Sequence, residues 1–233
     1  MPELADHGHI EQADAPPARE LITTLAGSAR RAGRAAVVSG RWLGDTVVDM
    51  VPRLPLRDVK TLSRHHDGAT DAALARAMVR SSARVSAAIG AGTGGLVAFQ
   101  ELSIAGMIAI PFELAAETAA VVLVELKLVA ELHRVAGRPF EGGPSQQAAA
   151  AIRSWLSGRA VKATAVTGGV DLLGRATRVK LNAALRRRFS RNLATLAPLL
   201  AGSAAAAWLN RRATLAVGRS VADDLGLWRE GRG

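Results

Sequence analysis

Cysteine and tyrosine are absent from this chain of 233 residues, and aromatic residues make up only 3% of it. Without cysteine the chain can form neither a disulfide nor a thiolate metal site, which suits a reducing compartment. Clean alternation of apolar and polar residues over about five positions is also lacking, so no convincing strand is predicted. The 49% apolar content comes mainly from Ala, Leu and Val, and Ala and Leu strongly favour helices. We therefore expect an all-α fold: one domain, a multi-helix bundle whose central helices are apolar and rich in Gly and Ala.

Catalytic signatures are also missing. The chain contains no Gly-x-Ser-x-Gly elbow, no His-Glu-x-x-His helix and no phosphate-binding Gly-Lys-Ser/Thr loop. Its five histidines, two of them near the N-terminus, leave few candidates for general acid–base work. The start of the chain also lacks the basic and apolar stretches of a secretory signal. These absences predict a non-enzymatic protein without a cofactor.

Composition divides the chain into four parts. Residues 1–16 are rich in acidic residues and poor in apolar ones, which predicts a disordered acidic tail. Residues 17–68 are expected to form N-terminal helices followed by a polar linker. Residues 69–228 are expected to form the main helical domain, and residues 229–233 a flexible C-terminus.

Proline and glycine mark the expected ends of the helices. A glycine cluster at residues 90–95 is expected to interrupt the pattern, and Pro111 is expected to open a long helix. The predicted helices cover residues 17–39, 41–51, 70–88, 111–137, 145–167 and 175–196, with a last helix that continues through 192–210 to 227.

Two apolar segments approach the length that crosses a bilayer. Residues 85–112 carry a single charge and residues 192–210 carry none, but both depend on Ala and Gly and are interrupted by glycine or proline. Basic residues flank the second segment on both sides: Arg191 precedes it and Arg211 follows it. A single crossing would place one of these basic ends outside, against the positive-inside rule. This pattern favours a helix that is buried in protein, lies on a membrane or re-enters it. A helical hairpin made from residues 85–135 remains an alternative.

Residues 88–96 match the glycine spacing of dinucleotide-binding turns, and an acidic residue, Glu113, follows about twenty residues later. Those glycines would let the backbone approach a pyrophosphate. However, no hydrophobic strand precedes them. The favoured interpretation is a glycine-lined bend or a close helix crossing, because Gly90 and Gly94 stand four residues apart. Gly90, Gly94 and Gly202 are therefore expected at close contacts between helices.

The long helix after Pro111 carries several ionisable side chains: Glu113, Glu117, Glu125, Glu131 and His133. Carboxylates at positions 113 and 117 share one helix face and could hold a metal or act as acid and base. The Glu-x-x-His pair of di-iron bundles is missing, because Glu131 and His133 are two residues apart. The favoured interpretation is a solvated stripe in which Lys127 pairs with Glu131.

The strongest functional candidate is the basic stretch of residues 153–191, which holds ten basic residues and one acidic residue. Within it Leu181, Leu185 and Phe189 form an apolar stripe with arginines on either side, as in a helix that lies at a membrane interface. The alternative is a surface helix packed on its own core. The candidate residues for binding anionic lipid or phosphate are Arg186, Arg187, Arg188, Arg191, Arg211 and Arg212.

Nucleic acid is the competing partner for these arginines, since it also presents phosphates. No aromatic residues alternate with the arginines to stack on bases, and neither a helix-turn-helix nor a zinc signature is present.

Two stretches resemble the bacterial EcsC family, especially its actinobacterial branch. Residues 111–137 form a proline-led segment that ends L-K-L-V-A-E-L-H-R-V-A-G, and residues 191–225 contain N-L-A-T-L-A-P-L-L-A-G-S-A-A-A-A-W-L-N-R-R-A-T. The second is similar to the closing pattern of the family: a proline, a glycine, a small-residue helix, then Asn210 and a basic end. The resemblance implies a helical protein often linked to the inner membrane and sometimes to transporter operons. It implies no catalytic residues.

The sequence thus predicts a non-enzymatic helical protein at the cytoplasmic face of the inner membrane, peripheral or partly embedded. Its expected partner is an anionic membrane surface, and further partners would be a transporter or other membrane protein, or a second copy of the chain. The first alternative is a soluble module that binds nucleic acid or an acidic protein. The second alternative is a dinucleotide-dependent enzyme that uses the glycines between Gly90 and Gly95.

Overall fold

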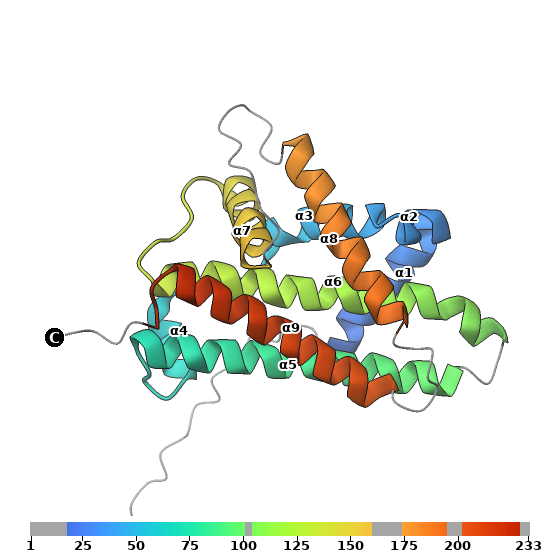
Figure 1. Ribbon diagram of the computed structural model, residues 1–233, viewed down its shortest axis with the longest axis horizontal. Coiled ribbons are helices and arrows are strands. Elements are labelled where there is room, and N and C mark those ends of the chain that lie inside the picture. The colour runs from blue at the N-terminus through green and yellow to red at the C-terminus, as the bar shows by residue number, and fades with distance from the viewer. Residues whose placement is uncertain (1–17, 101–103, 160–173, 195–201, 229–233) are drawn as a thin grey trace, which may run out of the picture.

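Helix α6, Ile104–Val135, lies at the centre of the bundle and contacts every other helix that the structure describes. The structure is a computed structural model that describes residues 18–100, 104–159, 174–194 and 202–228 (Figure 1). Between residues 113 and 132 every residue of α6 is buried except Val124 and Lys127, which are partly buried. A helix that is apolar on all sides has to be buried on all sides, and this explains its central position.

Helices α5, Asp71–Gln100, and α9, Gly202–Asp224, complete a layer of long helices with α6 (Figure 1). α5 and α6 run antiparallel, and α9 packs along α5 over most of its length. Gly90 permits this close approach, because a Cβ atom there would lie 2.8 Å from backbone atoms of Ala206. α5 and α9 can therefore bring their backbones together and bury small side chains between them.

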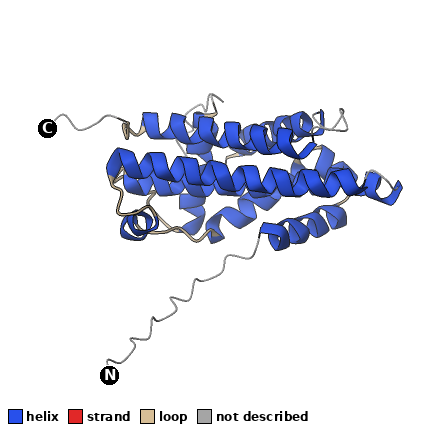
Figure 2. Ribbon diagram, turned by 90° about the horizontal axis from the view of Figure 1, so that it is seen from below, coloured by secondary structure: helices blue, strands red, loops and turns tan. Residues whose placement is uncertain are grey.

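The other helices are shorter and pack against the remaining faces of α6. Figure 2 shows the bundle from below, with helices on both sides of the long helix that crosses the middle of the view. They are α1 (Ala18–Ala32), α2 (Arg34–Val38), α3 (Arg41–Met50), the 3₁₀ turn η1 (Val51–Arg53), α4 (Val59–His65), α7 (Pro144–Gly158) and α8 (Arg175–Ala194). Their ends follow local chemistry: Gly33 has φ 85° between α1 and α2, and the Asp58 side chain caps α4 by accepting from Thr61 N.

The prediction of an all-α, single-domain bundle is confirmed, since all regular structure in the described ranges is helical. Within those same ranges no helix is both long enough and apolar enough to cross a membrane. Three predicted segments lie outside the described residues: the tail at 1–16, the C-terminus at 229–233, and the last eight residues of the helix predicted over 145–167.

Four expectations about helix boundaries are wrong. The helix predicted over 17–39 is divided at Gly33, and the linker predicted to end at residue 68 contains α4. The glycine cluster at 90–95 lies inside α5 instead of bending the chain, and Pro111 lies inside α6 instead of opening it. Packing against neighbouring helices offsets the helix cost of about 1 kcal/mol for each glycine and about 3 kcal/mol for the proline, so these residues do not end a helix here.

Candidate anion-binding site

A buried cluster of charged and polar side chains surrounds Glu125 of α6, whose side chain is fully buried. The carboxylate accepts from Trp155 Nε1 at 2.9 Å, from Arg188 Nη1 at 2.9 and 3.0 Å, and from Arg159 Nη2. Thr214 Oγ1 lies 3.0 Å from Oε1 of the same carboxylate and 2.9 Å from Ser86 Oγ. The cluster therefore connects α5, α6, α7, α8 and α9 through one carboxylate.

The two guanidiniums decide the charge of Glu125. Burial alone would raise its pKa, but the positive charges of Arg188 and Arg159 and their hydrogen bonds outweigh it and hold the pKa at about 2. Burial lowers the pKa of Arg159; Glu125 opposes this, and the neighbouring charges of Arg188 and Arg191 add to it. Arg159 thus lies near two further guanidiniums as well as the ionised carboxylate.

Glu117 lies two turns earlier on α6 and has a different environment. Its Oε1 accepts from Asn210 Nδ2, and Asn210 in turn accepts from Arg188 Nη2 at 3.3 Å. Burial raises the pKa of Glu117 to about 7, against the opposing effects of the Asn210 hydrogen bond and the Arg188 charge. Glu117 is therefore only partly ionised at neutral pH, whereas Glu125 is fully ionised.

The expectation of a solvated carboxylate stripe on this helix is wrong, because all four of its glutamates are buried. Glu113 pairs with Arg30 at 3.1 Å, and Glu131 pairs with Arg57 at 2.8 Å. The predicted contact between Lys127 and Glu131 is present at 3.2 Å. The segments packed around α6 exclude water from these carboxylates and supply hydrogen-bond donors in its place. The donors are arginines for Glu113, Glu125 and Glu131, and Asn210 for Glu117.

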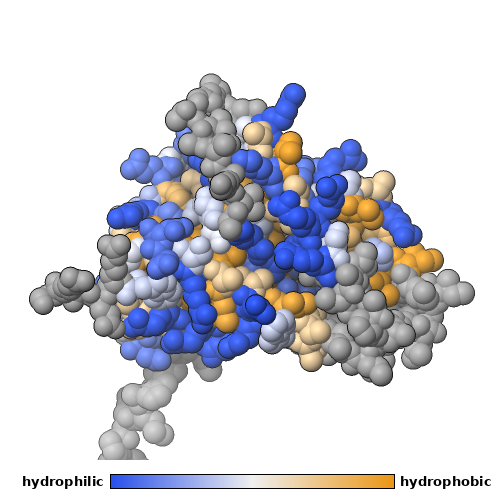
Figure 3. Space-filling view, viewed as in Figure 1, coloured by the Kyte–Doolittle hydropathy of each residue, from blue (hydrophilic) through white to orange (hydrophobic). Residues whose placement is uncertain are grey.

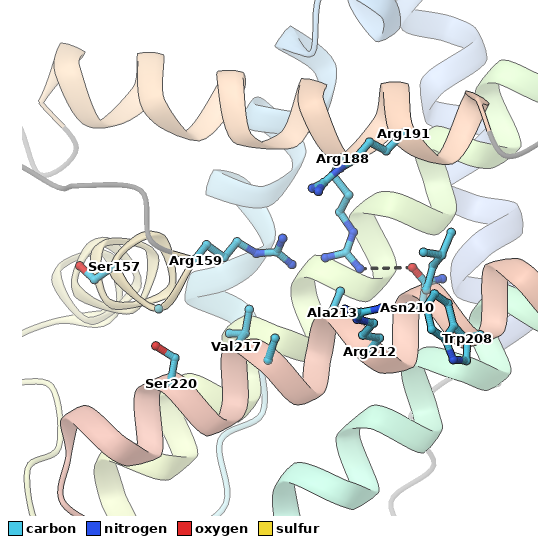
Figure 4. A pocket seen from close by; sticks show the side chains of 13 residues that line it. Ser157, Arg159, Arg188, Arg191, Trp208, Asn210, Arg212, Ala213, Val217 and Ser220 are labelled. Carbon is cyan, nitrogen blue, oxygen red and sulfur yellow. Dashed lines mark hydrogen bonds between the residues drawn. The ribbon is translucent and has the colours of Figure 1, made fainter.

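A cavity of ≈ 640 Å³ opens beside this cluster, between α7, α8 and α9. Figure 4 shows Arg159 and Arg188 converging on it, Arg159 from the end of α7 and Arg188 from α8, with the Arg188 guanidinium bonded to Asn210. Arg191 and Arg212 also line the cavity, and the Arg212 guanidinium lies 5.1 Å above the Trp208 ring. The cavity is therefore strongly cationic on one side and has an aromatic ring on its wall.

The predicted apolar stripe on the basic helix faces the protein interior. Leu181, Leu185 and Phe189 of α8 are at most 2% exposed. The stripe therefore packs on the bundle, as the alternative interpretation had it, and is not free to enter a bilayer. Arg188 is also only 4% exposed and bonds to Glu125, so it is buried in the bundle, unlike its neighbours Arg186 and Arg187.

The structure divides the predicted arginines into two groups. Arg188, Arg191 and Arg212 meet at the cavity, although they come from two helices. Arg186, Arg187 and Arg211 are exposed and do not line it. Figure 3 shows hydrophilic residues gathered over α8 on the face of Figure 1, with small apolar patches beside them.

Of the three glycines expected at helix contacts, Gly90 lies against Ala206. The structure describes Gly94 and Gly202 only as parts of α5 and α9, so the expected contacts at these two glycines stay a prediction. The dinucleotide pattern of residues 88–96 lies within α5, whereas a pyrophosphate-binding turn needs a strand, a loop and the start of a helix. That hypothesis therefore lacks its structural context. In the described part of the chain no three His, Asp or Glu side chains gather as metal ligands do.

Sequence reasoning missed Arg159, Trp155 and Trp208 as members of the site. A signal for the first two was present at Glu125, a lone carboxylate in the apolar run A-V-V-L-V-E-L, since a buried carboxylate needs a cation and further donors. Nothing local to Arg159 or Trp155 identifies them as those donors. Trp208 has no sequence signal of its own, because its role depends on where Arg212 lies.

The chain matches no model of a known protein family, no curated protein and no solved structure. The resemblance to EcsC proteins therefore stays a prediction.

Proposed function

We propose that this protein is a non-enzymatic helical protein that binds an anionic membrane surface through exposed arginines of α8 and α9. The observation that carries the proposal is the exposed basic surface of these two helices, together with the indole of Trp208, which is 55% exposed. α8 contains seven basic residues and no acidic one. The basic surface consists of Arg186, Arg187, Arg191, Arg211 and Arg212, all exposed.

Physical chemistry sets the mode of binding. Each basic residue close to an anionic surface contributes about 1 kcal/mol, and a tryptophan is suited to the headgroup region. The apolar stripe of α8 is buried in the bundle, so attraction between charges supplies most of the binding energy. We therefore expect peripheral binding that high salt reverses. The resemblance to EcsC proteins favours the cytoplasmic face of the inner membrane and a transporter as a further partner.

Flotation with lipid vesicles tests the proposal. Purified full-length protein is mixed with phosphatidylcholine vesicles, with or without phosphatidylserine, and floated on a density gradient. The wild type is expected to float only with the anionic vesicles and to be released by high salt. Exchanging Arg186, Arg187 and Arg211 for Gln is expected to weaken binding about 100-fold, from about 3 kcal/mol lost.

The matched control removes the same charge from another exposed helix face. Arg76, Arg80 and Arg84 follow one another at four-residue intervals on α5 and are exposed, so their triple exchange for Gln lowers net charge equally. Equal loss of binding in both triple variants would mean that only total charge matters and would overturn the assignment to α8 and α9. Failure to float at all, combined with tight binding to DNA or RNA, would replace the membrane with nucleic acid.

A further inference from the structure

The cavity between α7, α8 and α9 carries more positive charge than its surroundings neutralise. Arg159, Arg188 and Arg191 all line it, and Arg159 is close enough to the other two to be affected by their charges. One carboxylate, Glu125, bonds to Arg159 and Arg188. Glu117 reaches the cavity only through its hydrogen bond to Asn210. Glu125 neutralises only one of the two buried guanidiniums, Arg159 and Arg188, and the second is costly to hold at a partly dry site without an anion. The exposed guanidinium of Arg191 adds another positive charge at the same cavity.

Hydrogen-bonding capacity at the site is also unused. Arg159 Nε is buried, and none of the described residues accepts a hydrogen bond from it. A buried donor without an acceptor costs on the order of 1–3 kcal/mol, so this atom favours a bound acceptor. No described residue forms an ion pair with Arg191, which lines the same cavity. Excess charge and a free donor thus coincide at one place.

The walls of the cavity indicate what else the ligand contains besides an anionic group. One wall is formed by Ala213, Ala216 and Val217 of α9, with the Trp208 ring beside it. The volume of ≈ 640 Å³ lies within the usual range of small-molecule sites, and an inorganic anion would leave most of it empty. The site therefore suits a compact anionic group attached to an organic part.

We propose that this cavity binds a phosphomonoester, with its phosphate between Arg159, Arg188 and Arg191 and its organic part along α9 toward Trp208. A phosphomonoester carries a charge of about −1.5 to −2 at neutral pH and offers three acceptor oxygens, which matches the two unneutralised charges. Guanidiniums bind such groups through pairs of parallel hydrogen bonds. The proposal deepens the proposed function by naming the head group that the surface selects, and its lipid form rests on that function.

The test compares two kinds of anionic vesicle at matched zeta potential, one with phosphatidic acid, a phosphomonoester, and one with phosphatidylserine, a phosphodiester. The wild type is expected to bind the phosphatidic acid vesicles about tenfold more tightly. Arg191→Gln is expected to abolish this preference. Arg187→Gln, one turn away on α8, exposed and outside the cavity, is expected to keep the preference while weakening both kinds of binding equally.

A second pair of variants on α9 repeats the comparison. Arg212→Gln changes the cavity wall beside Trp208, and the neighbouring Arg211→Gln does not. All four substituted residues are exposed, so circular dichroism is expected to show wild-type helix content in each variant. Loss of the preference in the cavity variants alone supports the site. Equal preference in cavity and control variants overturns it.

A soluble arm separates a lipid head group from a free phosphorylated molecule. Thermal unfolding is followed with glycerol 3-phosphate, inorganic phosphate or, as an ionic control, sulfate. A rise in Tm with glycerol 3-phosphate that Arg191→Gln abolishes supports the cavity even when no vesicle binds, in which case the membrane proposal alone fails. Preference for phosphatidic acid without a rise in Tm assigns the site to lipid. If the protein shows neither a vesicle preference nor a phosphate-dependent rise in Tm, the inference is overturned, while general membrane binding is unaffected.

Discussion

Glu117 should make the folded protein less stable as the pH rises, and Glu117→Gln should remove this effect. The pKa of the side chain is about 7 in the folded protein against 4.5 when it is exposed. Below pH 4.5 the carboxyl is neutral in both states and burial carries no charge penalty. Between pH 4.5 and 7 the unfolded chain loses the proton and the folded one keeps it, so stability falls. At about 1.4 kcal/mol per pKa unit, the loss reaches about 3 kcal/mol above pH 7.

The glutamine variant keeps the shape of the side chain and a carbonyl oxygen that can accept from Asn210 Nδ2. It should therefore unfold with nearly wild-type free energy at pH 4.5 and be more stable than the wild type by about 3 kcal/mol at pH 8. Urea unfolding at several pH values, followed by circular dichroism, measures the difference. The quantity to compare is the difference in free energy of unfolding between the variant and the wild type. Burial lowers the pKa values of His66 and His133, so both proteins lose stability as the pH falls, and the difference cancels this shared effect.

Glu125→Gln is the matched contrast on the same helix. The pKa of Glu125 is about 2, so its ionised form contributes stability above pH 4.5 that is lost as the pH falls toward 2. Glutamine leaves the Arg159 and Arg188 charges uncompensated and should destabilise the protein at pH 7 by about 3–5 kcal/mol. The reasoning is refuted if Glu117→Gln destabilises at every pH, or if both variants respond to pH in the same direction.

Three smaller predictions concern packing and binding. Gly90→Ala should lower stability by about 1–3 kcal/mol in urea unfolding, because the new Cβ meets the Ala206 backbone; Gly92→Ala, with open space around it, should stabilise by up to about 1 kcal/mol. Equal effects of the two changes would exclude a close contact at position 90. Trp155→Phe should cost about 1–3 kcal/mol by removing a donor to Glu125, and an unchanged urea midpoint would show that this hydrogen bond is weak. Raising the salt concentration should detach the protein from anionic vesicles, and retention would point to burial of apolar side chains in the lipid.

Local sequence information was sufficient for the helical content and for the basic character of α8. Ala and Leu favour helix regardless of tertiary context, and the absence of acidic residues in α8 needs no folding to be seen. The stripe of Leu181, Leu185 and Phe189 also predicted which side of α8 is apolar. The stripe could not show what covers that side, because a membrane and a protein core both accept the same spacing.

Tertiary structure decided the site. Glu125 and Arg188 are 63 residues apart, and Glu125 and Thr214 are 89 apart, so no local pattern shows that they meet. The same holds for the glycine cluster, which ends no helix because α9 packs against Gly90. Helix formation depends on short-range preferences that a sequence displays directly. Burial of a charge and the opening of a cavity depend on which helix faces meet, and that is set by the packing of the whole chain.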